Sequence, residues 1–124
     1  HKLIVLDDCS FGGNLKNKQN GVISKLFCNG RHLLINILLT SQKYSDILTT
    51  ARENATGLML FSCSDKQLQL IGDDHNIMKN KKDFRKMFRK VTEQPYSFMT
   101  INYSNKKKDR YQDSEFNSIN INEN

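Results

Sequence analysis

The feature that most constrains the fold of this chain is a run of four apolar residues, Leu3 to Leu6, that ends in two adjacent carboxylates, Asp7 and Asp8. An unbroken apolar run predicts a strand that is buried on both faces of a sheet. Two acids at its end are costly to bury unless a cation meets them, and open α/β sheets bind ligands at the carboxyl ends of their strands. The run therefore predicts a ligand site where the first strand ends.

The acid pair has two interpretations. In the first it is a Walker B element: Asp7 holds Mg²⁺, directly or through water, and Asp8 orients or deprotonates the water that attacks a nucleoside triphosphate. In the second the strand runs into an ordinary turn, and Asp8 caps that turn or a helix. The pair by itself does not decide between them.

Two more apolar runs follow, from Leu33 to Leu39 and from Gly57 to Cys63. The segment from Tyr96 to Tyr103 alternates like a strand, with Phe98 and Ile101 as its expected core contacts. Helical spacing of apolar residues predicts helices at residues 15–29 and 81–93. Residues 44–54 read as a short helix, and Ser64 or Asp65 is expected to cap a further helix that runs through Ile71. Strands that alternate with helices predict an α/β fold with a mostly parallel sheet.

The net charge of +6 suits an acidic partner such as nucleic acid, and it equally suits an ordinary basic surface. The Lys and Arg residues of helix 81–93 have the same two interpretations, since they either keep the helix soluble or contact DNA. From Gln112 onward the chain is polar and rich in Asn, which predicts disorder. We therefore expect one folded domain, or part of one, at residues 1–111 and a disordered tail at 112–124.

Three cysteines, Cys9, Cys28 and Cys63, are odd in number, far apart and without C-x-x-C spacing. This pattern predicts reduced cysteines of an intracellular protein rather than disulfides or a zinc site. No apolar run approaches the length of about 18 residues that a membrane-spanning helix needs. Because the chain opens directly on a core strand, we expect an earlier part of a larger domain to be missing.

The order of these motifs resembles the carboxyl-terminal half of the genome-packaging ATPases of large DNA viruses and Polinton-type elements, in the FtsK/HerA group of RecA-like motors. The residues that carry the resemblance are, in order, Leu-Ile-Val-Leu-Asp7-Asp8, Gly30-Arg31-His32, the strand followed by Gln42, and Ala51-Arg52-Glu-Asn54. It covers roughly residues 2–72 and continues loosely to Tyr111. It implies a RecA-like, P-loop NTPase sheet, hydrolysis of ATP with Mg²⁺, and a ring, usually a hexamer, that drives double-stranded DNA.

The resemblance also assigns roles to single residues. Asp7 matches the acid on the Mg²⁺ side of Walker B, and Asp8 matches the catalytic carboxylate, where most of the superfamily has Glu. Gln42 matches the polar sensor that contacts the γ-phosphate or the attacking water. Arg52 matches a basic position after the sensor helix that could face a neighbouring subunit's nucleotide, and Arg31 is a second candidate for that role.

The chain departs from the family in one respect, because no G-x-x-x-x-G-K-[ST] motif occurs in it. In the family this phosphate-binding loop follows a strand that lies between the Gln42 strand and the Gly57 strand. We therefore expect the central strand of the sheet to be missing. We also expect the isolated chain to be inactive as an ATPase.

Two classes of function remain open. The first is part of a motor ATPase, whose partners would be double-stranded DNA, further copies of itself and capsid or portal components, in a viral factory, the host cytoplasm or the virion. The second is a non-enzymatic basic α/β module, such as a decayed ATPase copy, that binds nucleic acid or a partner protein. An in-frame phosphate-binding loop upstream of the codon for His1 would favour the first.

Overall fold

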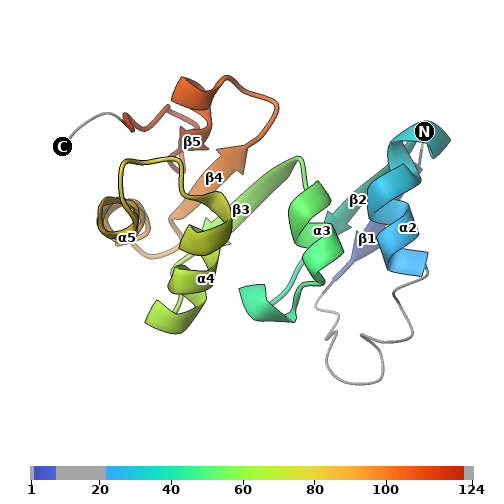
Figure 1. The fold of residues 1–124 in the computed structure, drawn as a ribbon, viewed down its shortest axis with the longest axis horizontal. Coiled ribbons are helices and arrows are strands. Elements are labelled where there is room, and N and C mark those ends of the chain that lie inside the picture. The colour runs from blue at the N-terminus through green and yellow to red at the C-terminus, as the bar shows by residue number, and fades with distance from the viewer. Residues whose placement is uncertain (1, 8–21, 122–124) are drawn as a thin grey trace. The chain divides into compact units, whose positions relative to one another are not determined.

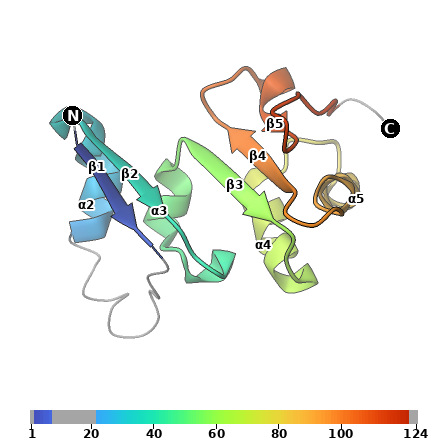
Figure 2. The ribbon, with the colours of Figure 1, turned by 180° about the vertical axis from the view of Figure 1, so that it is seen from behind.

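The structure, a computed structural model, describes residues 2–7 and 22–121 of the chain (Figure 1). The chain divides into two compact units, a first unit at residues 1–55 and a second unit at residues 56–124. Each unit has its own sheet, and Figure 2 shows the two sheets from behind. No helix in the described ranges is long and apolar enough to cross a membrane.

The first unit is built on two parallel strands, β1 (Lys2–Leu6) and β2 (Ile35–Leu39). Helix α2 (Val22–Asn29) and the short 3₁₀ helix η1 (Gly30–Leu33) connect them. After β2 the chain forms η2 (Tyr44–Asp46) and then α3 (Thr49–Asn54). The parallel pairing confirms the sequence prediction for these two strands, whereas the expected helix at 44–54 is split into two shorter helices.

Helices cover one face of the β1–β2 sheet. Residues at alternate positions of a strand share a face, and Leu6 of β1 and Leu39 of β2 both pack against Leu48 and Ala51 from the α3 region. The other face presents apolar side chains that remain exposed, namely Leu3 (64%), Val5 (52%) and Leu38 (54%). The expectation that the first strand is buried on both faces is therefore not met in the described part of the first unit, whose elements cover a single face.

The second unit has an antiparallel sheet in the order β3–β4–β5, formed by Gly57–Phe61, Phe98–Asn102 and Tyr111–Gln112. Its pairing corrects the prediction of a mostly parallel sheet, so the fold is mixed α/β. Two helices, α4 (Asp65–His75) and α5 (Lys81–Val91), separate β3 from β4. The chain therefore re-enters the sheet beside the end of β3, where Phe61 pairs with Phe98.

The core of the second unit lies between its sheet and its two helices. Seven large side chains are almost fully buried there, namely Leu68, Ile71, Phe84, Phe88, Met99, Ile101 and Tyr111. Gly72 of α4 lies against the ring of Phe84 on α5, where a Cβ atom would be in ordinary van der Waals contact at 3.4 Å. Ile101 is a core residue as expected, but Phe98 is not, because residues 98 and 101 lie on opposite faces of a strand.

The segment after β5 differs from the disordered tail that its composition predicts. Gln112 forms a bridge with Ser118, and the amide of Ile119 donates to the carbonyl of Tyr111 at 2.8 Å. The carboxylate of Asp113 accepts from the amides of two later residues, at 2.9 and 3.0 Å. Asp favours such turns because its side chain satisfies nearby backbone donors, and here it holds the polar segment in a defined turn.

Candidate functional site

The carboxyl ends of β1 and β2 bring two polar side chains together. The two strands are in register, with Leu6 opposite Leu39, so the next residue of each strand lies at the same edge of the sheet. The amide of Thr40 continues the ladder by donating to the carbonyl of Leu6 at 3.0 Å. Its hydroxyl donates to Oδ1 of Asp7 at 2.6 Å. The exposed edge thus presents a carboxylate that a neighbouring hydroxyl holds in place.

Gln42 follows Thr40 by two residues on the segment that leaves this edge. Its side chain is exposed. The turn that contains it is fixed by Ser41, whose hydroxyl donates to the carbonyl of Lys43 at 2.9 Å. Gln42 therefore leaves the sheet at the same end as Asp7, as the sequence predicts. Asp8, the second acid of the pair, lies outside the described residues.

Arg52 is held by contacts within the first unit. Its guanidinium lies over the ring of Tyr44, 5.2 Å from the centroid, and its Nη2 donates to the hydroxyl of Thr49 at 3.1 Å. Tyr44 is buried and begins η2, the next turn after Gln42. A cation over an aromatic face is attracted by the ring quadrupole. Arg52 is therefore fixed beside the segment that leaves the carboxyl end of β2.

Arg31 lies at the other end of β2. It belongs to η1, which precedes the strand, so its backbone is at the amino end of β2 while Asp7 is at the carboxyl end of β1. The Arg31 side chain lies outside the part of the chain that the structure describes. The structure thus separates the backbones of the two arginine candidates to opposite ends of β2.

The donor atoms at this edge suit a hard cation. Carboxylate and hydroxyl oxygens are typical ligands of Mg²⁺, which usually binds through one or two carboxylates together with substrate phosphates. The described residues contain no group of three or more His, Cys, Asp or Glu that could enclose a metal ion. The Asp7 carboxylate is thus of the type that could hold a Mg²⁺ ion together with substrate phosphates, with the hydroxyl of Thr40 orienting it.

Two features of this site were not predicted from the sequence. Thr40 has no role in the predicted site, and its bond to Asp7 becomes apparent once the strands are known to pair in register. The contact between Tyr44 and Arg52 has no periodic signal, because it spans a turn and a helix start.

Two of the three cysteines lie in the part of the chain that the structure describes. Both Cys28, which is exposed, and Cys63, which is half-buried, are free thiols. Burial raises the pKa of the Cys63 thiol, although the nearby Arg89 opposes this effect. Cys63 is therefore kept in its protonated, unreactive form. Cys9 lies outside the described residues.

Comparisons with known proteins find one matching sequence family and several similar solved structures. The sequence family described as Poxvirus A32 protein matches residues 1–118. The genome packaging NTPase B204 from Sulfolobus turreted icosahedral virus 2, in complex with ATP-gammaS, matches with a TM-score of 0.62 and 16% identity over 82% of this chain and 47% of that chain. A further structure, described as B204, the DNA-packaging ATPase from Sulfolobus Turreted Icosahedral Virus, has the same TM-score, identity and coverage.

The structure of the packaging NTPase with AMP matches with a TM-score of 0.56 and 14% identity, over 82% of this chain and 48% of that chain. No curated protein sequence matches the chain significantly. The chain spans about half the length of the solved structures that it matches. At these identities the likeness concerns the fold.

Proposed function

Since the chain belongs to the poxvirus A32 protein family, we propose that it supplies the Walker B and sensor half of an ATPase that packages double-stranded DNA. The predicted resemblance to viral packaging ATPases is confirmed by the family match and by the fold of B204. The specific roles of this chain's residues form the proposal.

The observation that carries the proposal is the placement of Asp7 at the carboxyl edge of two parallel strands, joined to Thr40 at 2.6 Å. In this proposal Asp7 holds Mg²⁺, and Asp8 positions the attacking water. Gln42, on the segment that leaves the same edge, senses the γ-phosphate. A bound Mg²⁺ would neutralise charge on the phosphates of ATP, and the hydroxyl of Thr40 would keep the Asp7 carboxylate oriented toward it.

The phosphate-binding loop comes, in this proposal, from a part of the motor outside this sequence, which has no G-x-x-x-x-G-K-[ST] motif. In the first unit β2 pairs with β1, and in the second unit β3 pairs with β4, so among the described elements each of these strands has one edge that no strand occupies. In this proposal, such an edge pairs with a strand from the rest of the motor.

The packaging NTPase from the Sulfolobus virus has been solved with ATP-gammaS and with AMPPCP, both analogues of ATP. By analogy we propose ATP as the nucleotide of the motor that contains this chain. Double-stranded DNA would be its cargo, and copies of the chain would assemble into a ring, a hexamer in the family. Capsid or portal components would be further partners, in the viral factory, the host cytoplasm or the virion.

The test uses a protein that joins this chain to the phosphate-binding half of the motor. Asp7→Ala should stop turnover by weakening the binding of Mg²⁺ and nucleotide. Asp8→Asn should stop turnover while ATP stays bound, because it removes the group that positions water. Glu53→Gln, on the exposed surface of α3, is the matched control and should keep normal turnover.

The assignment fails if Asp8→Asn keeps near-normal turnover. A Mg²⁺-dependent release of phosphate by the isolated chain, abolished by Asp8→Ala, would also contradict it. The phosphate-binding loop supplies most of the phosphate contacts through its backbone amides and Lys. The isolated chain, which lacks that loop, should therefore release no phosphate above background.

The second candidate, a non-enzymatic basic module, is favoured by the missing motif and by the net charge of +6. This candidate predicts that substitution of Asp7 or Asp8 leaves every activity of the protein unchanged. The two candidates therefore differ in whether Asp7→Ala has a consequence beyond stability. Nucleotide binding measured on this variant and on the wild type decides between them.

A further inference from the structure

The positive charge of the chain is concentrated in one short segment. Residues 79–90 contain seven Lys or Arg residues and one acid, Asp83. Their excess of six positive charges equals the net charge of the whole chain, so the remaining residues are neutral overall. A charge concentrated in this way produces a local field that a scattered surface charge does not.

Helix α5 places these charges on the side opposite to its buried face. Phe84 and Phe88 face the core and are completely buried. The cations that follow helical spacing, namely Lys82, Arg85, Lys86, Arg89 and Lys90, are all exposed. Residues three and four apart are neighbours on a helix surface, and the rise per residue makes this row about 12 Å long.

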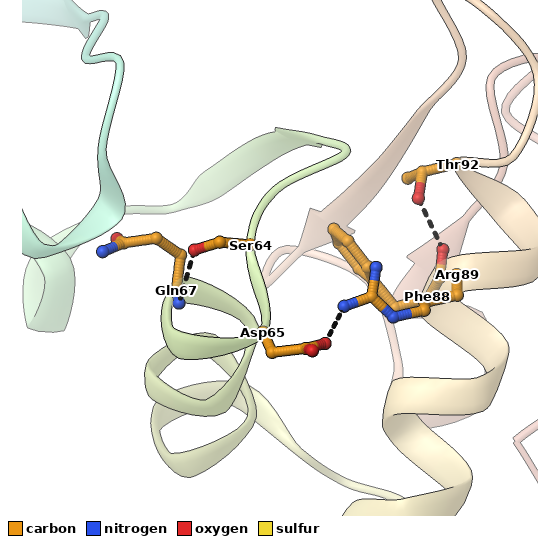
Figure 3. Close-up of polar contacts among 6 residues, drawn as sticks. All are labelled: Ser64, Asp65, Gln67, Phe88, Arg89 and Thr92. Carbon is orange, nitrogen blue, oxygen red and sulfur yellow. Dashed lines mark hydrogen bonds and ion pairs between the residues drawn. The ribbon is translucent and has the colours of Figure 1, made fainter.

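Two cations of α5 are engaged by acids of α4. The ammonium of Lys81 lies 2.5 Å from the carboxylate of Asp73. Arg89 pairs with Asp65 in the first turn of α4, and Figure 3 shows its guanidinium directed toward that carboxylate. These pairs hold the two helices together at both ends of α5.

Four cations of α5 form no ion pair with any residue in the described ranges, namely Lys82, Arg85, Lys86 and Lys90. We call them the α5 cation face. Like charges on one helix surface repel one another. A face of this kind is therefore stabilised by a ligand that carries several negative charges at matching intervals.

We propose that the α5 cation face binds the phosphate backbone of duplex DNA without reading its sequence. A row of about 12 Å spans about three or four phosphates along one strand of a duplex, since each strand carries a charge every ~3.4 Å. The aromatic side chains of α5 are buried, so the face offers no ring on which a single strand could stack its bases. Duplex DNA is therefore favoured over single strands.

This inference rests on the proposed packaging function, which identifies the polymer as DNA. It deepens that function by assigning the surface that binds the DNA. Binding to the face requires neither ATP nor Mg²⁺. The experiment can therefore be done without nucleotide, and its outcome is independent of the assignments of Asp7 and Asp8. A loss of DNA binding with intact ATP hydrolysis, or the reverse, distinguishes the two proposals.

The test compares two triple variants of the full chain. The first, Lys82→Gln with Lys86→Gln and Lys90→Gln, removes three charges from the α5 cation face. The second, Lys106→Gln with Lys107→Gln and Lys108→Gln, removes three exposed charges from elsewhere in the same unit. Because all six side chains are exposed, both variants should fold, and circular dichroism checks this.

Binding to a duplex of random sequence is measured by fluorescence anisotropy over a range of salt concentrations. Each phosphate contact contributes about 0.9 to the slope of log K against log salt. The α5 variant should lower the slope by about two to three and lower the affinity by about 100-fold at 0.1 M salt. The control variant should lose less than about threefold, as expected for a general change of net charge.

Three results would overturn the proposal. The first is an equal loss of affinity in both variants, which would mean that the charge acts non-locally. The second is a preference of the wild-type chain for single-stranded over duplex DNA. The third is displacement of the duplex by polyglutamate of matched charge at the same concentration, which would indicate a site for acidic proteins.

Discussion

Tyr111 joins three segments of the second unit through one buried hydroxyl. The hydroxyl donates to the carbonyl of His75 at the end of α4 and accepts from the amide of Ile77 at 2.9 Å. The ring lies 5.7 Å from that of Phe84 on α5. The imidazole of His75 is also hydrogen-bonded to the hydroxyl of Tyr103. Composition and periodicity do not predict this network, because its members are far apart in the sequence.

We expect Tyr111→Phe to lower the free energy of unfolding by about 1–3 kcal/mol, because the buried carbonyl of His75 and the partly buried amide of Ile77 both lose their partner. Urea unfolding at pH 7, followed by circular dichroism, measures the change. Tyr96→Phe is the control, since Tyr96 is 94% exposed and should be indifferent to the loss of its hydroxyl. Equal stabilities of the wild type and Tyr111→Phe would contradict the role of the network.

Tyr111 also makes the free energy of unfolding depend on pH in the alkaline range. Burial raises the pKa of Tyr111 to about 12, whereas a tyrosine in the unfolded chain ionises near pH 10. Between pH 10 and 12 only the unfolded state releases the proton of Tyr111. The stabilisation that Tyr111 gives to the folded state is therefore complete below about pH 10 and is lost as the pH rises toward 12. The decline in stability between pH 10 and 12 should be smaller in Tyr111→Phe, and an unchanged decline would refute this cause.

The sequence predicts the positions of helices and strands better than it predicts which strands pair with each other. The helical spacing of Phe84 and Phe88 predicts α5 and its buried face, and Ser64 at the start of α4 is a typical cap. The pairing of β3 with β4 is not predictable in this way. The apolar runs of β1 and β3 look alike, and the choice of a parallel or antiparallel neighbour depends on how the following helices return the chain.

The candidate site likewise has one feature that the sequence predicts and one that it does not. Asp7 and Gln42 were placed at one edge because parallel strands end together, a rule that needs no knowledge of side-chain packing. The fixing of Arg52 by Tyr44 depends on a contact across a turn, which only the folded chain provides.

Helix caps allow a prediction for single elements. Asn80 accepts a hydrogen bond from the amide of Asp83 at 2.8 Å, whereas Ser64 accepts from the amide of Gln67 at 3.4 Å. Loss of a good cap costs about 1 kcal/mol. We expect Asn80→Ala to destabilise the chain by about that amount and Ser64→Ala to cost less, as measured by urea unfolding. The reverse order would show that the length of the cap bond does not control its contribution.

At the scale of the whole molecule the two units differ in the quality of their cores. All seven of the largest fully buried side chains belong to the second unit. Among the described residues of the first unit the buried apolar side chains are Tyr44, Leu48 and Ala51, and the far face of its sheet leaves Leu3 and Val5 exposed. Buried apolar area is the main source of stability. The first unit should therefore be the less stable part of the isolated chain.

Amide hydrogen exchange tests this expectation in the isolated chain. Regions with few buried apolar contacts open locally at low free energy. The amides of β4, between Met99 and Ile101, should exchange slowest, and those of β1 and β2 should exchange at least tenfold faster. Equal protection of the two sheets would mean that the first unit gains stability from a source other than the packing described above.

In the proposed ring, Arg52 would act on the nucleotide of a neighbouring copy. In ring-shaped motors an arginine from one subunit can stabilise charge on the phosphoryl group bound by its neighbour, which raises kcat by roughly 10³ to 10⁵. Arg52 is the better candidate, because its guanidinium is fixed over Tyr44 on the segment that leaves the carboxyl end of β2. The backbone of Arg31 lies at the opposite end of that strand. A rigid support suits such a role, because a positioned charge needs no reorganisation during the reaction.

We therefore expect two inactive motors, Arg52→Ala and Asp8→Asn, to regain part of their ATP turnover when they are mixed. A mixed ring contains some interfaces in which one subunit supplies an intact Asp8 and its neighbour an intact Arg52. Turnover is measured against the mixing ratio, with each variant alone and a mixture of Arg31→Ala with Asp8→Asn as controls. If the Arg31 mixture regains activity while the Arg52 mixture does not, the two arginines must exchange roles, because complementation requires that the missing group be supplied across the interface.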